Sequence, residues 1–219
     1  MFDALVPAWN EEATVGAVVQ ALRAAPSVDR VLVLDDSSAD ATKERAKAEG
    51  AEVFTHEPPN WGKGEIMRAG LELVRSPFVG FFDADLLRFR PEHVEKMASF
   101  VREGFDQVCG LRDYGVLGAP SVLCPIITGE RICWRELLDQ VPWDCWEGYG
   151  VETGIGETAR RLGMRTALVI MQGVRNRNKF SKAGWLLGLV RQTKMVGKIV
   201  GTRRVLGMYH GQACHCEST

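Results

Sequence analysis

The stretch Phe78-Val79-Gly80-Phe81-Phe82-Asp83-Ala84-Asp85 joins an apolar run directly to two carboxylates. An uncharged run of this length is typical of a buried strand in a parallel sheet. Alternate side chains of an extended segment point the same way, so Asp83 and Asp85 can face one ligand together. A hard divalent cation held against phosphate oxygens would relieve their mutual repulsion. The alternative is a pair of aspartates that cap a helix or a turn.

The residues around this stretch alternate short β-branched runs with helical patterns. This alternation predicts an α/β fold, with a mostly parallel central sheet flanked by helices. We expect strands at residues 2–7, 30–35, 51–55 and 78–82. Helices are expected from Val15 to Leu22, from a cap at Ser38 or Asp40 to Ala48, at 64–74 and from Pro91 to Glu103.

The second half of the chain is less regular. It predicts a strand at 107–111, helices at 131–140 and 151–162, a strand at 166–171 and a final amphipathic basic helix. The sequence contains no internal repeat and no linker that would divide it. We therefore expect one domain over residues 1–219, made of a first half (1–104) and a second half (105–219).

Acidic side chains recur where the predicted strands end. Glu11 follows the first strand, Asp35 and Asp36 follow the second, and Asp83 and Asp85 follow the fourth. Ligands of open α/β sheets bind at the carboxyl ends of the strands. These residues therefore predict a ligand site at that edge of the sheet.

The composition is that of an ordinary globular protein, with 46% hydrophobic and 25% charged residues among 219. Six cysteines at irregular spacings favour free thiols in a reducing cytosol. No signal peptide or membrane-spanning helix is evident. We therefore expect a cytoplasmic protein.

The net charge of -1 conceals a basic region, since residues 158–216 contain twelve Lys or Arg and no Asp or Glu. Such a region suits a phosphate-bearing substrate or an anionic membrane surface, and the alternative is a solvated basic face. The amphipathic pattern around Trp185 to Ile199 predicts packing on the core or in a homodimer, or peripheral contact with the inner face of a membrane. Nucleic acid is not expected as a partner, because aromatic residues do not interleave with the basic ones.

A cluster near the C-terminus combines His210, Cys214, His215 and Cys216. These residue types bind zinc, but a structural zinc site needs a second paired element, and the chain has no CxxC. The alternative reading is an ordinary chain terminus.

Four segments occur in the order found in one enzyme family: residues 6–12 (VPAWNEE), 33–42 (VLDDSSADAT), 62–64 (GKG) and 82–85 (FDAD). In this order they resemble the motifs of GT-A-fold (Rossmann-like) glycosyltransferases of the family 2 type. Two later segments, 128–131 (TGER) and 148–152 (GYGVE), are similar to the acceptor half of small bacterial members and of glucosyl-3-phosphoglycerate synthases. The resemblance implies that residues 1–104 bind a nucleotide sugar and that residues 105–219 bind the acceptor.

By this resemblance, nine residues bind the nucleotide-sugar donor: Pro7, Ala8, Trp9, Glu11, Asp36, Lys63, Asp83, Ala84 and Asp85. Asp36 would reach the base, and Lys63 would bring a point charge to the diphosphate or the base. Asp85, with Asp83 directly or through water, would hold Mg²⁺ or Mn²⁺ on the diphosphate.

Two further roles follow from the same resemblance. Relatives often complete the metal site with a histidine, and Asn176 falls closest to that position here. Glu152 is the candidate base for the acceptor hydroxyl in an inverting transfer, or it stabilises the first turn of its helix, and the stereochemistry stays open. A Gly-Arg-Val-Thr element associated with phosphoglycerate binding is missing from residues 110–125, which argues against that acceptor.

The expected function is metal-dependent transfer of a sugar from a nucleotide sugar to a hydroxyl or phosphate-bearing acceptor. UDP-sugars are preferred as donors over GDP-mannose, and the acceptor is unknown. Two alternatives are a sugar nucleotidyltransferase and a non-catalytic module that binds nucleotide sugars or a membrane surface. A nucleotidyltransferase normally carries a longer glycine-rich loop after its first strand than Ala8-Trp9-Asn10 provides.

Overall fold

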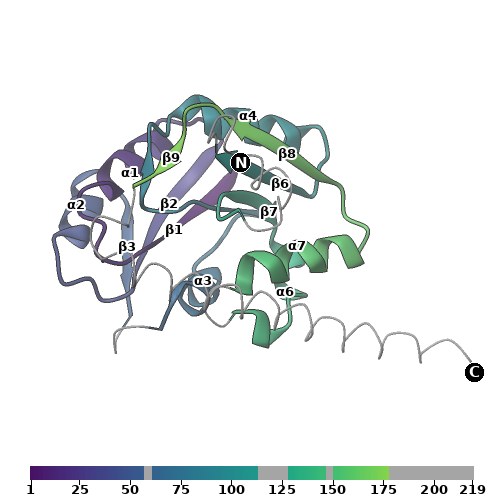
Figure 1. Ribbon diagram of the computed structural model, residues 1–219, viewed down its shortest axis with the longest axis horizontal. Coiled ribbons are helices and arrows are strands. Elements are labelled where there is room, and N and C mark those ends of the chain that lie inside the picture. Colours follow the sequence, from purple (N-terminus) through teal and green to yellow (C-terminus); the bar gives the residue numbers. More distant parts are fainter. Residues whose placement is uncertain (57–60, 113–127, 147–149, 178–219) are drawn as a thin grey trace, which may run out of the picture.

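A seven-stranded sheet forms the centre of the protein in a computed structural model that describes residues 1–56, 61–112, 128–146 and 150–177 (Figure 1). The strand order is β3-β2-β1-β4-β7-β6-β8. Its strands are β1 (Phe2–Ala8), β2 (Val28–Asp35), β3 (Glu52–Thr55), β4 (Phe78–Phe81), β6 (Gln107–Arg112), β7 (Arg131–Trp134) and β8 (Thr166–Met171). Only β7 runs antiparallel to its neighbours, so the prediction of a mostly parallel sheet is confirmed.

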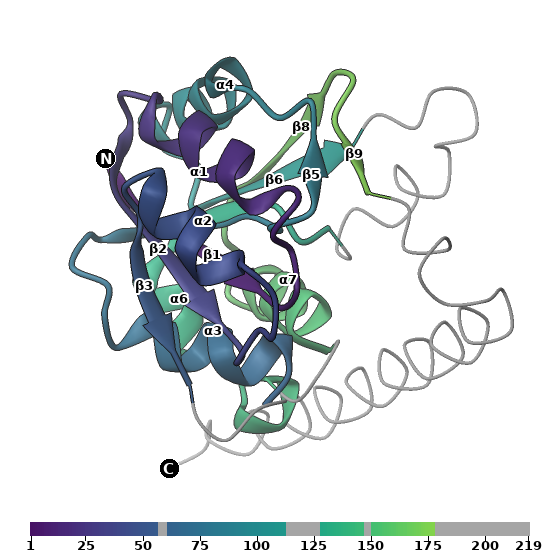
Figure 2. The ribbon, with the colours of Figure 1, turned by 90° about the vertical axis from the view of Figure 1, so that its left-hand side faces the viewer.

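Helices cover both faces of this sheet (Figure 2). One face packs against α1 (Val15–Arg23), α2 (Thr42–Ala48) and α4 (Pro91–Arg102), and the other against α3 (Lys63–Leu71), α6 (Arg135–Asp139) and α7 (Val151–Arg161). Successive strand residues supply the two cores, because side chains alternate between the faces of a sheet. Ala4 and Val6 lie in the first core, and Leu5 lies in the second.

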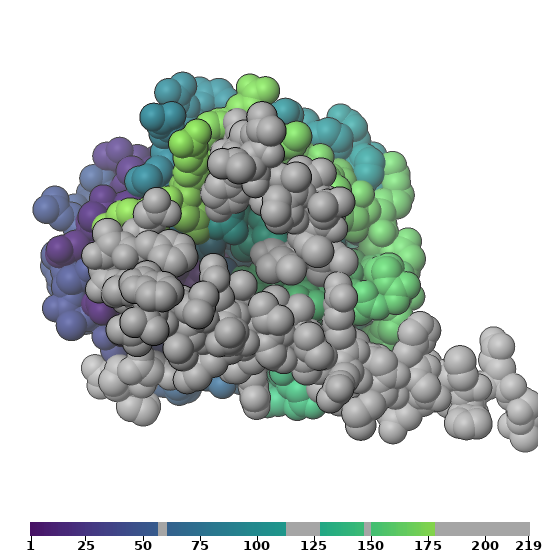
Figure 3. Space-filling model, in the orientation of Figure 1, coloured from purple at the N-terminus to yellow at the C-terminus, as the bar shows by residue number. Residues whose placement is uncertain are grey.

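A second, two-stranded sheet pairs β5 (Leu86–Leu87) with β9 (Arg175–Asn176) in antiparallel register. This pairing places Asn176 opposite Leu86, immediately after the aspartate pair. A short 3₁₀ helix, η3 (Trp143–Trp146), precedes α7. In the space-filling view, the residues of the first 55 positions lie on the left and those of α7 and β8 on the right (Figure 3).

Two local predictions are corrected by the structure. Residues 131–134 were expected to be helical, but they form β7, which fills the place between β4 and β6. Long-range pairing on both edges, with Ile132 and Cys133 fully buried, overrides the helical pattern. Neither Ser38 nor Asp40 is the N-cap of α2, which is Ala41. Ser38 instead accepts a hydrogen bond from the backbone N–H of Asn10.

Three further expectations concern the C-terminal region, the cysteines and membrane-spanning helices. The predicted C-terminal amphipathic helix and the cluster from His210 to Cys216 lie outside the described residues. Cys109, Cys133 and Cys145 are buried free thiols. Among the residues that the structure describes, none of the helices combines the length and the apolar character needed to cross a membrane.

Candidate active site

The loops that follow β1 and β2 are held to each other by hydrogen bonds. Asn10 donates its backbone N–H to Ser38 Oγ at 2.9 Å, and its side-chain oxygen accepts from the backbone N–H of Ala39 at 2.9 Å. Asn10 and Ser37 both have a φ of 55°, a left-handed conformation that is costly for residues other than glycine. The two loops are therefore fixed in shape at the carboxyl ends of their strands.

Asp36, in the second of these loops, organises the start of α3. Its two carboxylate oxygens accept hydrogen bonds from the backbone N–H groups of Trp61 and Gly62, both at 3.0 Å. Gly62 has a φ of 93°, which a side chain would strain. The turn that Gly62 permits places Lys63 as the first residue of α3.

Lys63 links the two halves of the chain. Its Nζ lies 2.6 Å from Asp83 Oδ1 and 2.6 Å from Glu152 Oε1. Burial lowers the pKa of Lys63, but the two carboxylates more than offset burial and hold that pKa above its ordinary value. Lys63 is therefore a permanent cation between the aspartate pair and the candidate base.

A cavity of about 290 Å³ lies at this edge of the sheet. All nine residues that the sequence predicts for donor binding line it, together with Gly62 and Ile66: Pro7, Ala8, Trp9, Glu11, Asp36, Lys63, Asp83, Ala84 and Asp85. Trp9 is 47% exposed, which leaves an aromatic face at the rim of the cavity. The structure thus brings the four motifs together around one space.

The two aspartates have different surroundings. Asp85 is buried, and its Oδ1 accepts a hydrogen bond from Asn176 Nδ2 at 3.1 Å, while its backbone oxygen accepts from the N–H of Arg177 at 2.9 Å. Asp83 faces Lys63 with Oδ1, and its Oδ2 lies 3.7 Å from the guanidinium of Arg112. The second half of the chain therefore contacts both carboxylates, and Lys63 of the first half also holds Asp83.

The oxygen donors of this pair suit a hard divalent cation, which needs few protein ligands when phosphate oxygens and water supply the rest. Asp85 and Asp83 are both carboxylates at the wall of the cavity. In the described part of the chain, no group of three or more His, Cys, Asp or Glu could hold a metal by itself. Two carboxylates of this kind fit a hard divalent cation whose remaining ligands are other oxygen atoms.

Glu152 lies in the first turn of α7 and is largely buried, with 9% of its side chain exposed. Its backbone oxygen accepts a hydrogen bond from the buried guanidinium of Arg131 at 3.1 Å, and Arg131 also donates to the backbone oxygen of Thr128 at 2.6 Å. The first turn of α7 is thus tied to the segment before β7. This contact fixes Glu152 against Lys63.

Sequence reasoning did not assign roles to Arg112, Glu130 and Arg131. Glu130 is fully buried, and its Oε2 lies 3.4 Å from Arg112 Nε. Burial, with a smaller contribution from the charge of Asp83, raises the pKa of Glu130 to about 7, against the lowering effects of Arg112 and Lys63. The segment Thr128-Gly129-Glu130-Arg131 resembles relatives of the family, but nothing in the neighbouring sequence indicates which distant residues it contacts.

Residues 3–120 match glycosyl transferase family 2, and the chain belongs to this family. Among curated relatives, the glucosyl-3-phosphoglycerate synthase of Mycolicibacterium smegmatis is 33% identical over 80% of this chain and 70% of that protein. The Mycobacterium tuberculosis enzyme of the same name is 32% identical over 80% of this chain and 66% of its own length. The chain therefore spans about two thirds of these relatives.

Solved structures agree with this assignment. The crystal structure of glucosyl-3-phosphoglycerate synthase from M. tuberculosis with Mn²⁺, uridine diphosphate and phosphoglyceric acid has a TM-score of 0.75 and 29% identity, over 91% of this chain and 76% of that chain. A complex of the same protein with Mn²⁺, UDP-glucose and phosphoglyceric acid has a TM-score of 0.74 and 28% identity, over 91% of this chain and 78% of that chain. This protein is a family 2 glycosyltransferase, and the expected enzyme class is confirmed.

Proposed function

We propose that this protein transfers glucose from UDP-glucose to a hydroxyl group of a small phosphate-bearing acceptor, with Mn²⁺ or Mg²⁺. The observation that carries the proposal is the cavity of about 290 Å³ that all nine predicted donor-binding residues line. UDP and UDP-glucose are the ligands named for the similar M. tuberculosis structures, which supports a uridine donor over GDP-mannose.

Within the cavity, the chain's own residues would divide the work as follows. Asp36 has free lone pairs on oxygens that already fix residues 61 and 62, so it can accept an N–H of the base. Lys63 would place its positive charge beside the diphosphate. Asp85 and Asp83 would hold the metal, which, when bound, neutralises the charge of the leaving diphosphate.

Glu152 is the proposed base. It would take the proton of the acceptor hydroxyl as the new bond forms between that oxygen and the anomeric carbon of the sugar. The bond from the anomeric carbon to the diphosphate breaks at the same time, and its electron pair leaves with UDP. Lys63 lies 2.6 Å from Glu152, so the base and the leaving group would share one cation.

A phosphate-bearing acceptor is supported by the names of the relatives and by the basic composition of residues 158–216. Residues 110–125 lack the Gly-Arg-Val-Thr element associated with phosphoglycerate binding, so several phosphate-bearing acceptors must be compared by experiment. Phosphoglyceric acid and glycerol 3-phosphate occur in the M. tuberculosis complexes and are therefore the first compounds to test.

The test is a mass-spectrometric assay of the purified protein with UDP-glucose, UDP-galactose or GDP-mannose, Mn²⁺, and a pool of acceptors that includes both compounds. We expect a glucosylated phosphate ester from UDP-glucose only. A product formed from GDP-mannose alone would contradict the proposal that UDP-glucose is the donor. Tight UDP binding with no product from any acceptor would favour the non-catalytic alternative.

A further inference from the structure

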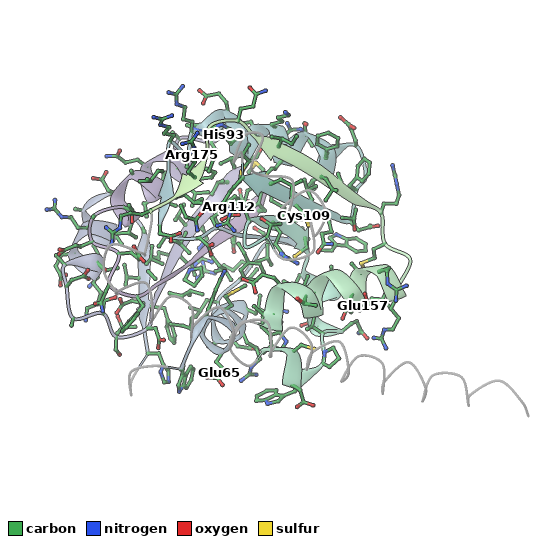
Figure 4. All side chains as sticks on the ribbon, in the orientation of Figure 1. Glu65, His93, Cys109, Arg112, Glu157 and Arg175 are labelled. Atoms are coloured by element: carbon green, nitrogen blue, oxygen red, sulfur yellow. The ribbon has the colours of Figure 1, made fainter. Side chains whose placement is uncertain are left out.

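Arg112 and Asn176, which come from β6 and β9, meet at the aspartate pair. The guanidinium of Arg112 donates a hydrogen bond to Asn176 Oδ1 and lies 3.7 Å from Asp83 Oδ2. Asn176 in turn donates its Nδ2–H to Asp85 Oδ1 at 3.1 Å. Arg112 is only 15% exposed and is labelled near the centre of the molecule in Figure 4.

Arg112 is itself held from behind by Glu130. The Glu130 carboxylate is fully buried, accepts a hydrogen bond from the Thr128 hydroxyl at 2.9 Å and lies 3.4 Å from Arg112 Nε. The backbone at Gly129, between Thr128 and Glu130, is packed against the site, because a Cβ on Gly129 would lie 2.8 Å from Asp83 Oδ2. The Arg112 guanidinium therefore lies between Glu130 and Asp83, which strongly constrains its position.

The neighbours of Asn176 decide which way its amide faces. A guanidinium can only donate hydrogen bonds, and an ionised carboxylate can only accept them. With Arg112 on one side and Asp85 on the other, only one orientation satisfies both: oxygen toward Arg112 and N–H toward Asp85. The amide oxygen, which is the atom that could ligate a metal, is therefore turned away from Asp85.

We propose that Asn176 is a positioning residue for Asp85, oriented by Arg112, and not a ligand of the divalent metal, so that the chain's own metal ligands are limited to the carboxylates of Asp83 and Asp85. This inference rests on the proposed function and replaces the expectation that Asn176 is a third metal ligand. Asp85 and Asp83 then supply the protein's carboxylates, and the diphosphate oxygens complete the coordination.

The test is a Mn²⁺ titration followed by electron paramagnetic resonance, with the full chain in the presence and absence of UDP. We expect UDP to tighten Mn²⁺ binding at least tenfold, and we expect Asn176→Asp, which adds a third carboxylate, to bind Mn²⁺ without UDP at least tenfold more tightly than wild type. Equal Mn²⁺ affinity of the wild type with and without UDP would overturn the inference.

A second variant tests the role of Arg112 directly. Arg112→Met/Glu130→Gln removes the guanidinium and avoids an unpaired buried carboxylate, so that the Asn176 oxygen becomes free to turn toward the metal. We expect Mn²⁺ binding without UDP to become tighter than in wild type, and Arg175→Met, at an exposed position of β9, to leave it unchanged. Unchanged or weaker binding by the double variant would contradict the orienting role.

The same titrations separate this inference from the proposed function. If calorimetry detects no UDP binding with or without Mn²⁺, the proposed function fails and this inference fails with it. If UDP binds and the Mn²⁺ affinity of the protein is the same with and without UDP, only the inference is contradicted and the proposed function is not.

Discussion

The proposed donor half (residues 1–104) and the described part of the proposed acceptor half (105–112, 128–146 and 150–177) meet at Lys63 and the aspartate pair but contribute to the site in different ways. In the donor half, the site residues other than Lys63 lie in or just after the end of a strand, and Lys63 begins α3 after a turn that Asp36 holds through the backbone N–H of Gly62. In the acceptor half, the residues that reach the site come from separate elements: Arg112, Glu130, Glu152 and Asn176.

This difference shows that the nearby sequence positions some residues of a site, whereas long-range strand pairing positions others. The donor side follows from the rule that ligands bind at the carboxyl ends of parallel strands. The acceptor side depends on which distant strands become neighbours, because β6 brings Arg112 to Asp83, β9 brings Asn176 to Asp85, and Glu130, just before β7, pairs with Arg112. Substitutions on the two sides should therefore have different effects on activity, ligand affinity and stability.

Asp85→Asn should have the largest effect on activity. It removes a carboxylate that we propose as a metal ligand, and the leaving diphosphate then loses electrostatic stabilisation worth about a thousandfold in rate. The measurement is kcat/KM for UDP-glucose at saturating Mn²⁺. Asp29→Asn, at an exposed position of the donor half, is the matched control and should behave as wild type. A loss smaller than tenfold would contradict the role of Asp85.

Glu152→Gln tests the acceptor side. The amide oxygen can still accept a hydrogen bond from Lys63, but the group cannot take a proton, so kcat should fall about a hundredfold. UDP affinity, measured by calorimetry, should change less than threefold. Glu157→Gln is the control, since Glu157 lies on the same helix and pairs with Arg160. A change in KM with unaltered kcat would argue for a binding role alone.

Glu130→Gln tests a contact that only the acceptor half contributes. Burial raises the pKa of Glu130 to about 7 from the ordinary 4.5 of a glutamate, so the folded protein binds a proton that the unfolded chain releases. The resulting stabilisation is complete below about pH 4.5 and is lost as the pH rises through about 7.

The free energy of unfolding of the wild type, relative to Glu130→Gln, should therefore fall by on the order of 2 kcal/mol between pH 5 and pH 8. Urea titrations of both proteins at several pH values measure this difference. Parallel pH profiles for the two proteins would show that Glu130 titrates normally.

The sequence predicted the strands, the helices and the cavity-lining positions of the donor side correctly, because the patterns that mark them span only a few residues. The apolar run before Asp83, the glycines around Lys63 and the acidic residues after each strand are all visible within a few positions. The strands and helices of this half have nearly the predicted bounds, and their order implies the parallel sheet. The roles of these residues remain predictions, which the substitutions above test.

The acceptor side was harder because its signals depend on pairing. Residues 131–134 read as helix but form β7, since both neighbouring strands need a partner there. That strand delivers the buried Arg131 and follows Glu130 directly, and neither residue differs in type from ordinary surface charges. Asn176 was noticed only through the resemblance, and the sequence could not show that Arg112 would face its amide.

Asp36→Asn should have the smallest effect and returns to the donor side. Each Asp36 oxygen accepts a backbone N–H at 3.0 Å and keeps a lone pair that can accept N3–H of uracil, a group that cytosine lacks. In the variant, an NH₂ group faces one of those N–H groups, so UDP affinity should fall about tenfold, the loss expected for one hydrogen bond to a charged group. Calorimetry with UDP and CDP gives a sharper result than UDP alone, because wild type should prefer UDP and the variant should narrow that preference. An unchanged UDP to CDP ratio would mean that Asp36 only shapes the turn before Lys63, and the local pattern would then have predicted the position of this residue without predicting its role.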